Sequence, residues 1–133
     1  MTTTMNRLPV STWKGIEDGT FPSGTSQYER PSAAIMIPEW IPENCIGCNQ
    51  CGVVCPHAAI RPFLVTEDEA ANAPEGFIVK DFRGPVKGLK YRIVVDPEDC
   101  YGCGICANTC PAPKKALVMQ PAETELPKQN LWD

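Results

Sequence analysis

The sequence predicts a small α+β protein made of two related halves, with short helices and small antiparallel β-elements. Three observations carry this prediction. A 15-residue segment occurs twice, at residues 42–56 and 97–111. An apolar, strand-prone run precedes each copy, and a small apolar patch follows each copy. Together these features indicate a duplicated unit with pseudo-two-fold symmetry.

Composition limits the classes to which the chain can belong. It has 133 residues, a net charge of −4 and no cluster of Lys or Arg, so nucleic acid and anionic membranes are poor candidate partners. The longest apolar stretch, residues 33–37, is too short to cross a membrane. The first residues contain no apolar signal region, which predicts a cytoplasmic protein. In that compartment, eight cysteines are more often metal ligands or redox groups than disulfides.

The two copies share the cysteine spacing C-x2-C-x2-C-x3-C-P. Residues 42–56 are PENCIGCNQCGVVCP and residues 97–111 are PEDCYGCGICANTCP, and eight of the 15 positions are identical. This run is typical of bacterial ferredoxins with two [4Fe–4S] clusters, in which the fourth cysteine of each run completes the neighbouring cluster. The predicted ligands are Cys45, Cys48, Cys51 and Cys110 for cluster 1, and Cys100, Cys103, Cys106 and Cys55 for cluster 2. The crossed ligands would tie the two halves together.

The residues between the cysteines suit a buried cluster. Glycines let the backbone come close to the inorganic core, so that N–H groups can point at its sulfur atoms: Gly47, Gly52, Gly102 and Gly104. Pro56 and Pro111 lack an N–H group and turn the chain after each crossing ligand. Apolar side chains are predicted to exclude water from the clusters: Ile46, Val53, Val54, Ile60, Ile105 and Leu117.

Two zinc sites and a disulfide framework are the alternative interpretations of the eight cysteines. Structural zinc usually separates its C-x2-C pairs by a dozen or more residues, whereas here four cysteines fall within eleven residues. The spacing therefore favours two [4Fe–4S] clusters, and no ligand is replaced in a way that would predict a three-iron cluster. His57, the only histidine, is expected at the surface or beside a cluster rather than as a proton-coupled group. Lys114 and Lys115 are expected to be a solvated pair.

Three parts are predicted along the chain: an extended N-terminal arm at 1–31, a two-cluster domain at 32–120 with an insert at 61–96, and a C-terminal tail at 121–133. The arm has no helical period but contains the large apolar residues Trp13, Phe21 and Tyr28. It is expected to pack either on another surface or around its own domain. The tail has no core pattern except Leu131-Trp132, and a frayed end or a truncated connection is expected there.

The insert is predicted to contain a helix and a hairpin. Residues 66–69 form a capping box that opens a short helix, which Pro74 and Gly76 end. Residues 77–82 and 89–95 are strand-prone and flank a turn, which predicts a β-hairpin. The hairpin would either shield a cluster from solvent or dock a partner.

Nearly the whole chain, residues 8–126, resembles the ferredoxin-type domain of pyruvate:ferredoxin (flavodoxin) oxidoreductases. The specific segments are EDGTFPSGTSQYE in the arm and CNQC-x3-CPHAAIRP in the first copy. The segment CYGC-x2-C-x3-CPAPKKAL in the second copy is also similar. Ordinary two-cluster ferredoxins lack such an arm, so the resemblance goes beyond the cysteine runs.

The resemblance implies a bacterial two-cluster ferredoxin-like fold and a role in electron relay. Electrons from the coenzyme A-dependent decarboxylation of pyruvate would pass to an external ferredoxin or flavodoxin. Thiamine diphosphate and a third [4Fe–4S] cluster would belong to the remaining domains of the oxidoreductase, which are the expected partners. No thiamine diphosphate motif occurs here, since Asp18-Gly19 lacks the second Gly before it and an Asn at the needed distance. We therefore expect no catalytic residue in this chain and no pyruvate oxidation by it alone.

The family's polypeptide is several times longer than this chain. We expect an excised segment, with Met1 to Met5 added ahead of it. A naturally separate subunit is the alternative. The rival functions are a free-standing soluble two-cluster ferredoxin and a zinc-stabilised interaction module.

Overall fold

The computed structural model describes residues 8–133, apart from the side chains of residues 26 and 27. The expectation for Met1 to Met5 therefore lies outside the described residues. The chain separates into two compact units, one ending at Arg30 and the other running from Pro31 to Asp133. All eight cysteines lie in the second unit.

The first unit contains two short 3-10 helices in its described part, η2 (Val10–Trp13) and η3 (Thr25–Tyr28). Positive-φ glycines separate them, at positions 15, 19 and 24. Of the three large apolar residues noted in the sequence, Trp13 is half-buried, whereas Phe21 and Tyr28 are 55% and 77% exposed. Two of the three therefore leave most of their surface accessible.

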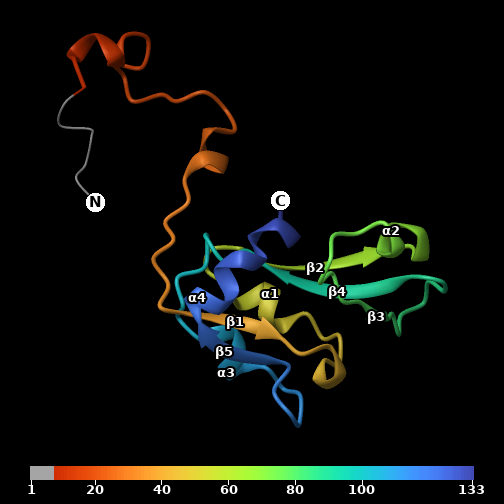
Figure 1. Ribbon diagram of the computed structural model, residues 1–133. Helices are drawn as coiled ribbons and strands as arrows, with labels where there is room; N and C mark the ends of the chain where they lie inside the picture. Colours follow the sequence, from red (N-terminus) through yellow and green to blue (C-terminus); the bar gives the residue numbers. More distant parts are fainter. Residues whose placement is uncertain (1–7) are drawn as a thin grey trace. The chain divides into compact units, whose positions relative to one another are not determined.

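The second unit contains two antiparallel sheets. In the first, β1 (Met36–Trp40) pairs with β5 (Leu117–Pro121), so that Trp40 lies opposite Leu117. In the second, the strand order is β2 (Ile60–Val65), β4 (Lys90–Val95) and β3 (Lys80–Asp81). Figure 1 shows the three-stranded sheet extending away from the β1–β5 pair. A strand thus precedes and follows each cysteine run, and each of these strands overlaps an apolar segment of the sequence.

The expected hairpin is present but shorter than predicted, and strand β2 was missed. Only Lys80 and Asp81 of the segment 77–82 pair with β4. β2 pairs along its full length with the other edge of β4, from Ile60 opposite Val95 to Val65 opposite Lys90. Pro62 is tolerated because β2 is an edge strand, and this proline also hides the strand from a sequence pattern.

Arg92 explains why the segment before β3 is not a strand. Its guanidinium Nη1 donates to the carbonyl oxygens of Gly76 and Ile78, at 3.3 and 2.7 Å. The guanidinium carbon also lies 4.4 Å from the ring centroid of Phe77. The Arg92 side chain therefore binds carbonyl groups that would have accepted backbone hydrogen bonds if strand β3 were longer.

Short helices connect the strands. η4 (Pro42–Asn44) precedes α1 (Gln50–Val54) in the first cysteine run, and α3 (Ile105–Thr109) lies in the second. α1 packs against α3 and β2, and α3 also packs against β5. The helix predicted in the insert is α2 (Glu67–Ala71), at the outer end of the three-stranded sheet (Figure 1). Its capping box is confirmed, since the Thr66 hydroxyl accepts from the Glu69 N–H and the Glu69 carboxylate accepts from the Thr66 N–H.

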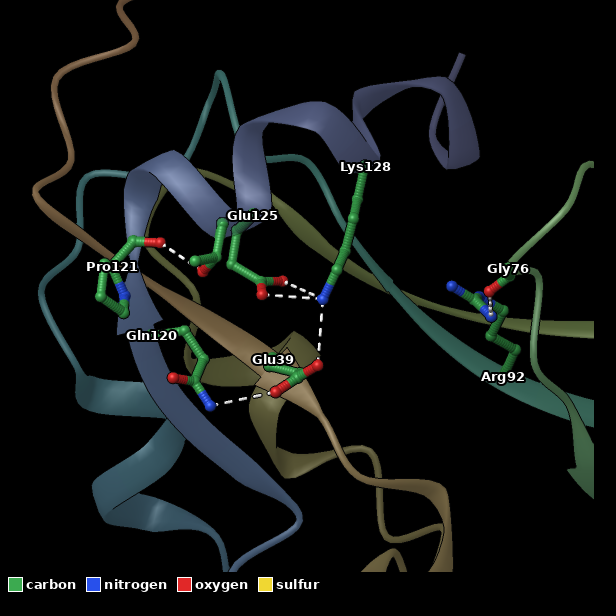
Figure 2. A network of polar contacts seen from close by, with 8 residues as sticks. Glu39, Gly76, Arg92, Gln120, Pro121, Glu125 and Lys128 are labelled. Atoms are coloured by element: carbon green, nitrogen blue, oxygen red, sulfur yellow. Dashed lines mark hydrogen bonds and ion pairs between the residues drawn. The ribbon is translucent and has the colours of Figure 1, made fainter.

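The C-terminal tail is helical and packs on the β1–β5 pair. It forms α4 (Ala122–Glu125) and η5 (Leu126–Leu131). Figure 2 shows Lys128 reaching both Glu125 and Glu39, with Nζ–Oε1 distances of 2.7 and 3.0 Å. Gln120 donates to the other Glu39 oxygen at 3.0 Å. The Glu125 side chain is only 7% exposed, and the Lys128 ammonium offsets the cost of burying the Glu125 carboxylate.

The core lies between the two sheets and the cysteine helices. One cluster of buried residues is built from Ile60, Tyr91, Ile93, Cys106 and Leu117, and a second from Ile37, Ala59 and Cys100. Cysteines belong to both clusters, so the fold cannot be separated from its cysteine sites. The α+β prediction with antiparallel strands is confirmed. Within residues 8–133, no helix has the length and apolar character needed to cross a membrane.

Candidate metal centres

The two cysteine runs adopt the same local structure. In each, a loop with two cysteines leads into a five-residue helix that contains the third, and the fourth caps the end of that helix. The residue before each helix has a left-handed backbone, with φ 59° at Asn49 and φ 72° at Gly104. These residues hold equivalent positions in the two copies, so asparagine and glycine build the same turn.

Gly102 lies close to the backbone of β1, which is a different neighbour from the inorganic core expected for these glycines. Its φ is +69°, and an added Cβ would lie 2.7 Å from the Met36 carbonyl oxygen of β1. Gly47, at the equivalent position, has φ +74° but nothing within 4 Å of an added Cβ. Glycine is therefore required by both conformation and space in the second loop, and by conformation alone in the first.

Four cysteines drawn from both runs line one small apolar cavity, hereafter the first cavity: Cys45, Cys48, Cys51 and Cys110. Trp40 of β1, Tyr91 and Ile93 of β4, and Leu117 of β5 complete its wall. Elements from both sheets therefore enclose the same four thiols.

The other four cysteines line a second cavity: Cys55, Cys100, Cys103 and Cys106. Ile60, Ile105 and Met119 are among the residues that complete its wall. Each cavity thus combines three cysteines of one run with the fourth cysteine of the other.

Four of the six predicted wall residues line a cavity. Ile46 and Leu117 line the first cavity, and Ile60 and Ile105 line the second. The prediction is wrong for Val53, whose side chain is 84% exposed. Val53 lies two residues after Cys51 on α1 and therefore points to the opposite side of the helix. Val54 lines neither cavity.

Strand β4 supplies wall residues that the sequence analysis missed. Tyr91 and Ile93 both face the first cavity, as alternate residues of one strand do. The Tyr91 hydroxyl donates to the Asn49 Oδ1 at 2.6 Å, and burial raises the pKa of Tyr91 above its usual value. The alternation of Tyr91 and Ile93 was visible in the sequence, but nothing local connected it with the cysteine run 42 residues away.

An aromatic pair lies at the edge of the second cavity. The rings of His57 and Tyr101 stack with centroids 4.0 Å apart and an angle of 14° between their planes. Both residues line the second cavity, and both are exposed to solvent. His57 is thus a surface residue beside the cysteines, as expected.

Burial controls the protonation of the innermost thiols. It raises the pKa of Cys51 to about 11, and the charges of Cys45 and Cys48 add to this effect. It raises the pKa of Cys106 to about 12, with contributions from the charges of Cys100, Cys103 and Cys51. Metal binding must therefore displace protons from these thiols. The helices that carry Cys51 and Cys106, α1 and α3, pack against each other, so the two cavities are neighbours.

The arrangement of the thiols fits a group larger than one ion. All eight cysteines are free thiols. Within residues 8–133, no group of three or more His, Cys, Asp or Glu side chains is close enough to hold a single metal ion. The cysteines of each cavity instead surround a space, which suits a polynuclear cluster ligated at its corners by four thiolates.

A larger and more open hollow lies between β1, β4 and the C-terminal helices. Trp40, Arg92 and Lys128 are among its lining residues, and none of that lining is a cysteine. Figure 2 shows this region between Lys128 and Arg92. Its size does not make it an iron–sulfur cluster site, because it offers no thiol ligands.

Comparison with known families agrees with the site. The model of the 4Fe-4S dicluster domain matches residues 44–116, which is more than half of the chain. The chain therefore belongs to the 4Fe-4S dicluster family, and its cofactors are two [4Fe–4S] clusters. A domain of unknown function matches residues 1–32.

Similar proteins confirm the resemblance to pyruvate oxidoreductases. The chain is 53% identical to the pyruvate-flavodoxin oxidoreductase of Enterobacter agglomerans, over 95% of this chain and 11% of the relative. It is 56% identical to the pyruvate:ferredoxin oxidoreductase of Moorella thermoacetica, over 89% of this chain and 10% of the relative. A mitochondrial pyruvate dehydrogenase (NADP+) of Euglena gracilis is 48% identical over 96% of this chain and 7% of the relative. The chain thus spans about a tenth or less of the length of these relatives.

Proposed function

We propose that the chain is the electron-relay segment of a longer 2-oxoacid oxidoreductase. One [4Fe–4S] cluster is ligated by the thiolates of the first cavity and the other by those of the second. The observation that carries this proposal is the crossing of the cysteine runs, with Cys110 in the first cavity and Cys55 in the second. A chain that holds two neighbouring clusters between its halves is suited to pass electrons from one to the other.

The charge interactions among the thiols support these ligand sets. After burial, the charges that raise the pKa of Cys100 include those of Cys55 and Cys103. Cys55 therefore lies close to cysteines of the other run. This agrees with the lining of the second cavity, where Cys55 stands with Cys100, Cys103 and Cys106.

We also propose that the two halves are related by pseudo-two-fold symmetry. The helices α1 and α3 hold equivalent positions in the two runs, and they pack against each other. The left-handed residues before them are equivalent as well. Such symmetry would make the exchange of the fourth cysteines mutual.

The clusters supply one-electron redox chemistry, and the protein residues set their environment. Trp40, Tyr91 and Leu117 exclude water from the first cavity, and Ile60, Ile105 and Met119 do so for the second. The Gly102 N–H lies 3.4 Å from the Cys100 Sγ and donates to it. Donors to the ligand sulfur stabilise the extra negative charge of a reduced cluster.

The proposed electron source is pyruvate, and the proposed acceptor is a ferredoxin or flavodoxin. The names of the relatives from Enterobacter and Moorella support both proposals. Because the chain spans about a tenth of those proteins, thiamine diphosphate and a third cluster are proposed for the remainder of the polypeptide. The arm at 1–31 is proposed to contact that remainder, which the exposed aromatic rings of Phe21 and Tyr28 support.

Metal analysis of anaerobically purified protein tests the central proposal. We expect about eight iron atoms and eight acid-labile sulfides per chain, and a brown colour that bleaches on reduction with dithionite. Colourless protein that contains zinc would support the interaction module instead. We also expect stable association with the rest of the oxidoreductase and no pyruvate oxidation by the chain alone. A protein that carries both clusters but never associates would be a free-standing ferredoxin.

A further inference from the structure

Charged groups of opposite sign lie beside the two cavities. At the first cavity, the half-buried Lys80 reaches across from β3 to the start of the first cysteine run. Its Nζ donates to the Pro42 carbonyl oxygen at 2.8 Å and to the carbonyl oxygen of Cys45. An ammonium group is therefore fixed on the backbone of a ligand of the first cavity.

A second ammonium approaches the same cavity from the other half of the chain. Lys115 Nζ donates to the carbonyl oxygens of Cys110 and Asn108, at 2.8 and 3.0 Å. Lys115 is exposed, as expected of a solvated lysine, but its ammonium also closes the C-terminal end of α3. Cys110 is the crossing ligand of the first cavity, so two ligands of this cavity carry a lysine on their own carbonyl group.

The second cavity has a buried carboxylate beside it. Asp96 is only 4% exposed, and its carbonyl oxygen accepts from the Cys100 N–H at 3.1 Å. Its Oδ1 accepts from the N–H groups of Glu98 and Asp99, both at 3.0 Å. The first copy has Ile41 at this position, so the carboxylate is particular to the second copy.

The exposure of two pairs of equivalent cysteines differs in the same direction. Cys100 and Cys106 are buried, at 8% and 6% exposure, whereas their counterparts Cys45 and Cys51 are only half-buried. A less solvated site disfavours the addition of negative charge. The exposure of these thiols and the fixed charges therefore both favour reduction at the first cavity over the second.

We propose that the two clusters differ in reduction potential and that the cluster of the first cavity has the higher one. This inference rests on the proposed function and adds an order to the relay. Reduction adds one electron and one negative charge to a cluster. The ammonium groups of Lys80 and Lys115 stabilise that charge at the first cavity, and the Asp96 carboxylate opposes it at the second. A single electron supplied to the oxidised chain therefore resides at the first cavity.

A hydrogen bond at the second cavity acts in the opposite direction. The N–H of Gly102 donates to the Cys100 Sγ at 3.4 Å, which favours reduction at the second cavity. It is a long hydrogen bond from a neutral donor, and such bonds are weaker than interactions with ionised groups. The full charges decide the order.

A redox titration of the full-length holoprotein, followed by electron paramagnetic resonance, tests the order. Lys80→Met and Lys115→Met should each lower the higher of the two potentials and leave the lower one in place. Asp96→Asn should raise the lower potential, while its Oδ1 still accepts the two backbone hydrogen bonds. We expect each variant to change the reduced-to-oxidised ratio of the affected cluster by about threefold to tenfold, where tenfold corresponds to about 59 mV.

Two matched variants separate charge from structure. Lys114→Met removes the same charge from the neighbouring lysine, which is exposed like Lys115 but is not held on a ligand carbonyl group in the part of the chain that the structure describes. It should shift the ratio by less than about twofold, because a charge that is not fixed beside a ligand is screened by solvent and salt. Lys80→Arg keeps the charge and should keep the higher potential near its original value. If Lys80→Met reduces the cluster content, Lys115→Met provides the same test from the opposite side of the cavity.

The outcomes are distinguishable from failure of the proposed function. Iron and sulfide analysis first establishes that both clusters are present in each variant. With both clusters intact, the inference is overturned if Lys80→Met moves the lower potential, if Asp96→Asn moves the higher one, or if neither variant shifts a potential. Absence of clusters from the unaltered protein would refute the proposed function itself.

Discussion

The two cysteine cavities have the same ligands but different surroundings. Position by position, the runs agree in all four cysteines and in the proline that follows them. Around them, Asn49 corresponds to Gly104, Ile46 to Tyr101 and Ile41 to Asp96. One cavity is thus bordered by an aromatic pair and a buried carboxylate, and the other by lysines and a Tyr91–Asn49 hydrogen bond. The comparison teaches that ligation is specified twice by one pattern, whereas packing and charge are specified separately for each site.

The largest expected effect comes from removal of a crossing ligand. Cys110→Ala should abolish the cluster of the first cavity, because only three cysteine ligands would remain there, and the cluster of the second cavity should be retained. We expect iron and acid-labile sulfide to fall to about half. Cys55→Ala is the matched control and should remove the other cluster instead. If Cys110→Ala removed the cluster built on Cys100, Cys103 and Cys106, the assignment of the crossing ligands would be wrong.

Buried wall residues should contribute similarly to the free energy of unfolding at both cavities. Ile60→Ala and Leu117→Ala each create a void beside one cavity, since these side chains are only 3% and 2% exposed. Each should lower the free energy of unfolding by about 2–5 kcal/mol, measured by anaerobic chemical denaturation of the holoprotein. Val118→Ala, at a residue that is 40% exposed, should cost less than about 1 kcal/mol. A large cost for Val118→Ala would show that exposure does not decide these effects.

The glycine loops provide a sharper comparison of the two copies. Gly47→Ala should cost about 1–2 kcal/mol of stability, because only the left-handed backbone disfavours alanine there. Gly102→Ala should cost more, because the added Cβ also meets the Met36 carbonyl oxygen at 2.7 Å. Denaturation of the two variants under the same conditions measures the difference. Equal costs would indicate that the Gly102 loop moves away from β1 without penalty.

The smallest effect is expected at position 104, where the two cysteine runs have different residues in the same backbone conformation. Gly104→Asn places in the second run the residue that the first run has at Asn49, and an added Cβ meets only the Asn108 Nδ2 at 4.0 Å. We expect the free energy of unfolding to change by no more than about 1 kcal/mol, since asparagine tolerates this conformation. Gly104→Val is the contrasting variant and should be clearly destabilised. Similar stability of the two variants would mean that the turn before α3 is not constrained.

The cysteine spacing and the capping box could be predicted because both are local patterns. Thr66 and Glu69 are three residues apart, and the structure forms their reciprocal hydrogen bonds. Each cysteine run likewise places its ligands within a single loop and helix. The sequence by itself therefore determined the cofactor class, the α+β fold and the short helix of the insert.

Only the tertiary structure decided what surrounds each group of thiols. The pairing of β2 with β4 brings Tyr91 and Ile93 to the first cavity, and β3 brings Lys80 there. The C-terminal tail looked unpatterned because its packing relies on Lys128 reaching Glu39, 89 residues away in sequence. Such contacts depend on which distant segments pair, and no short-range periodicity encodes that choice. The cysteine spacing therefore predicts the ligands, whereas their electrostatic environment can be seen only in the folded chain.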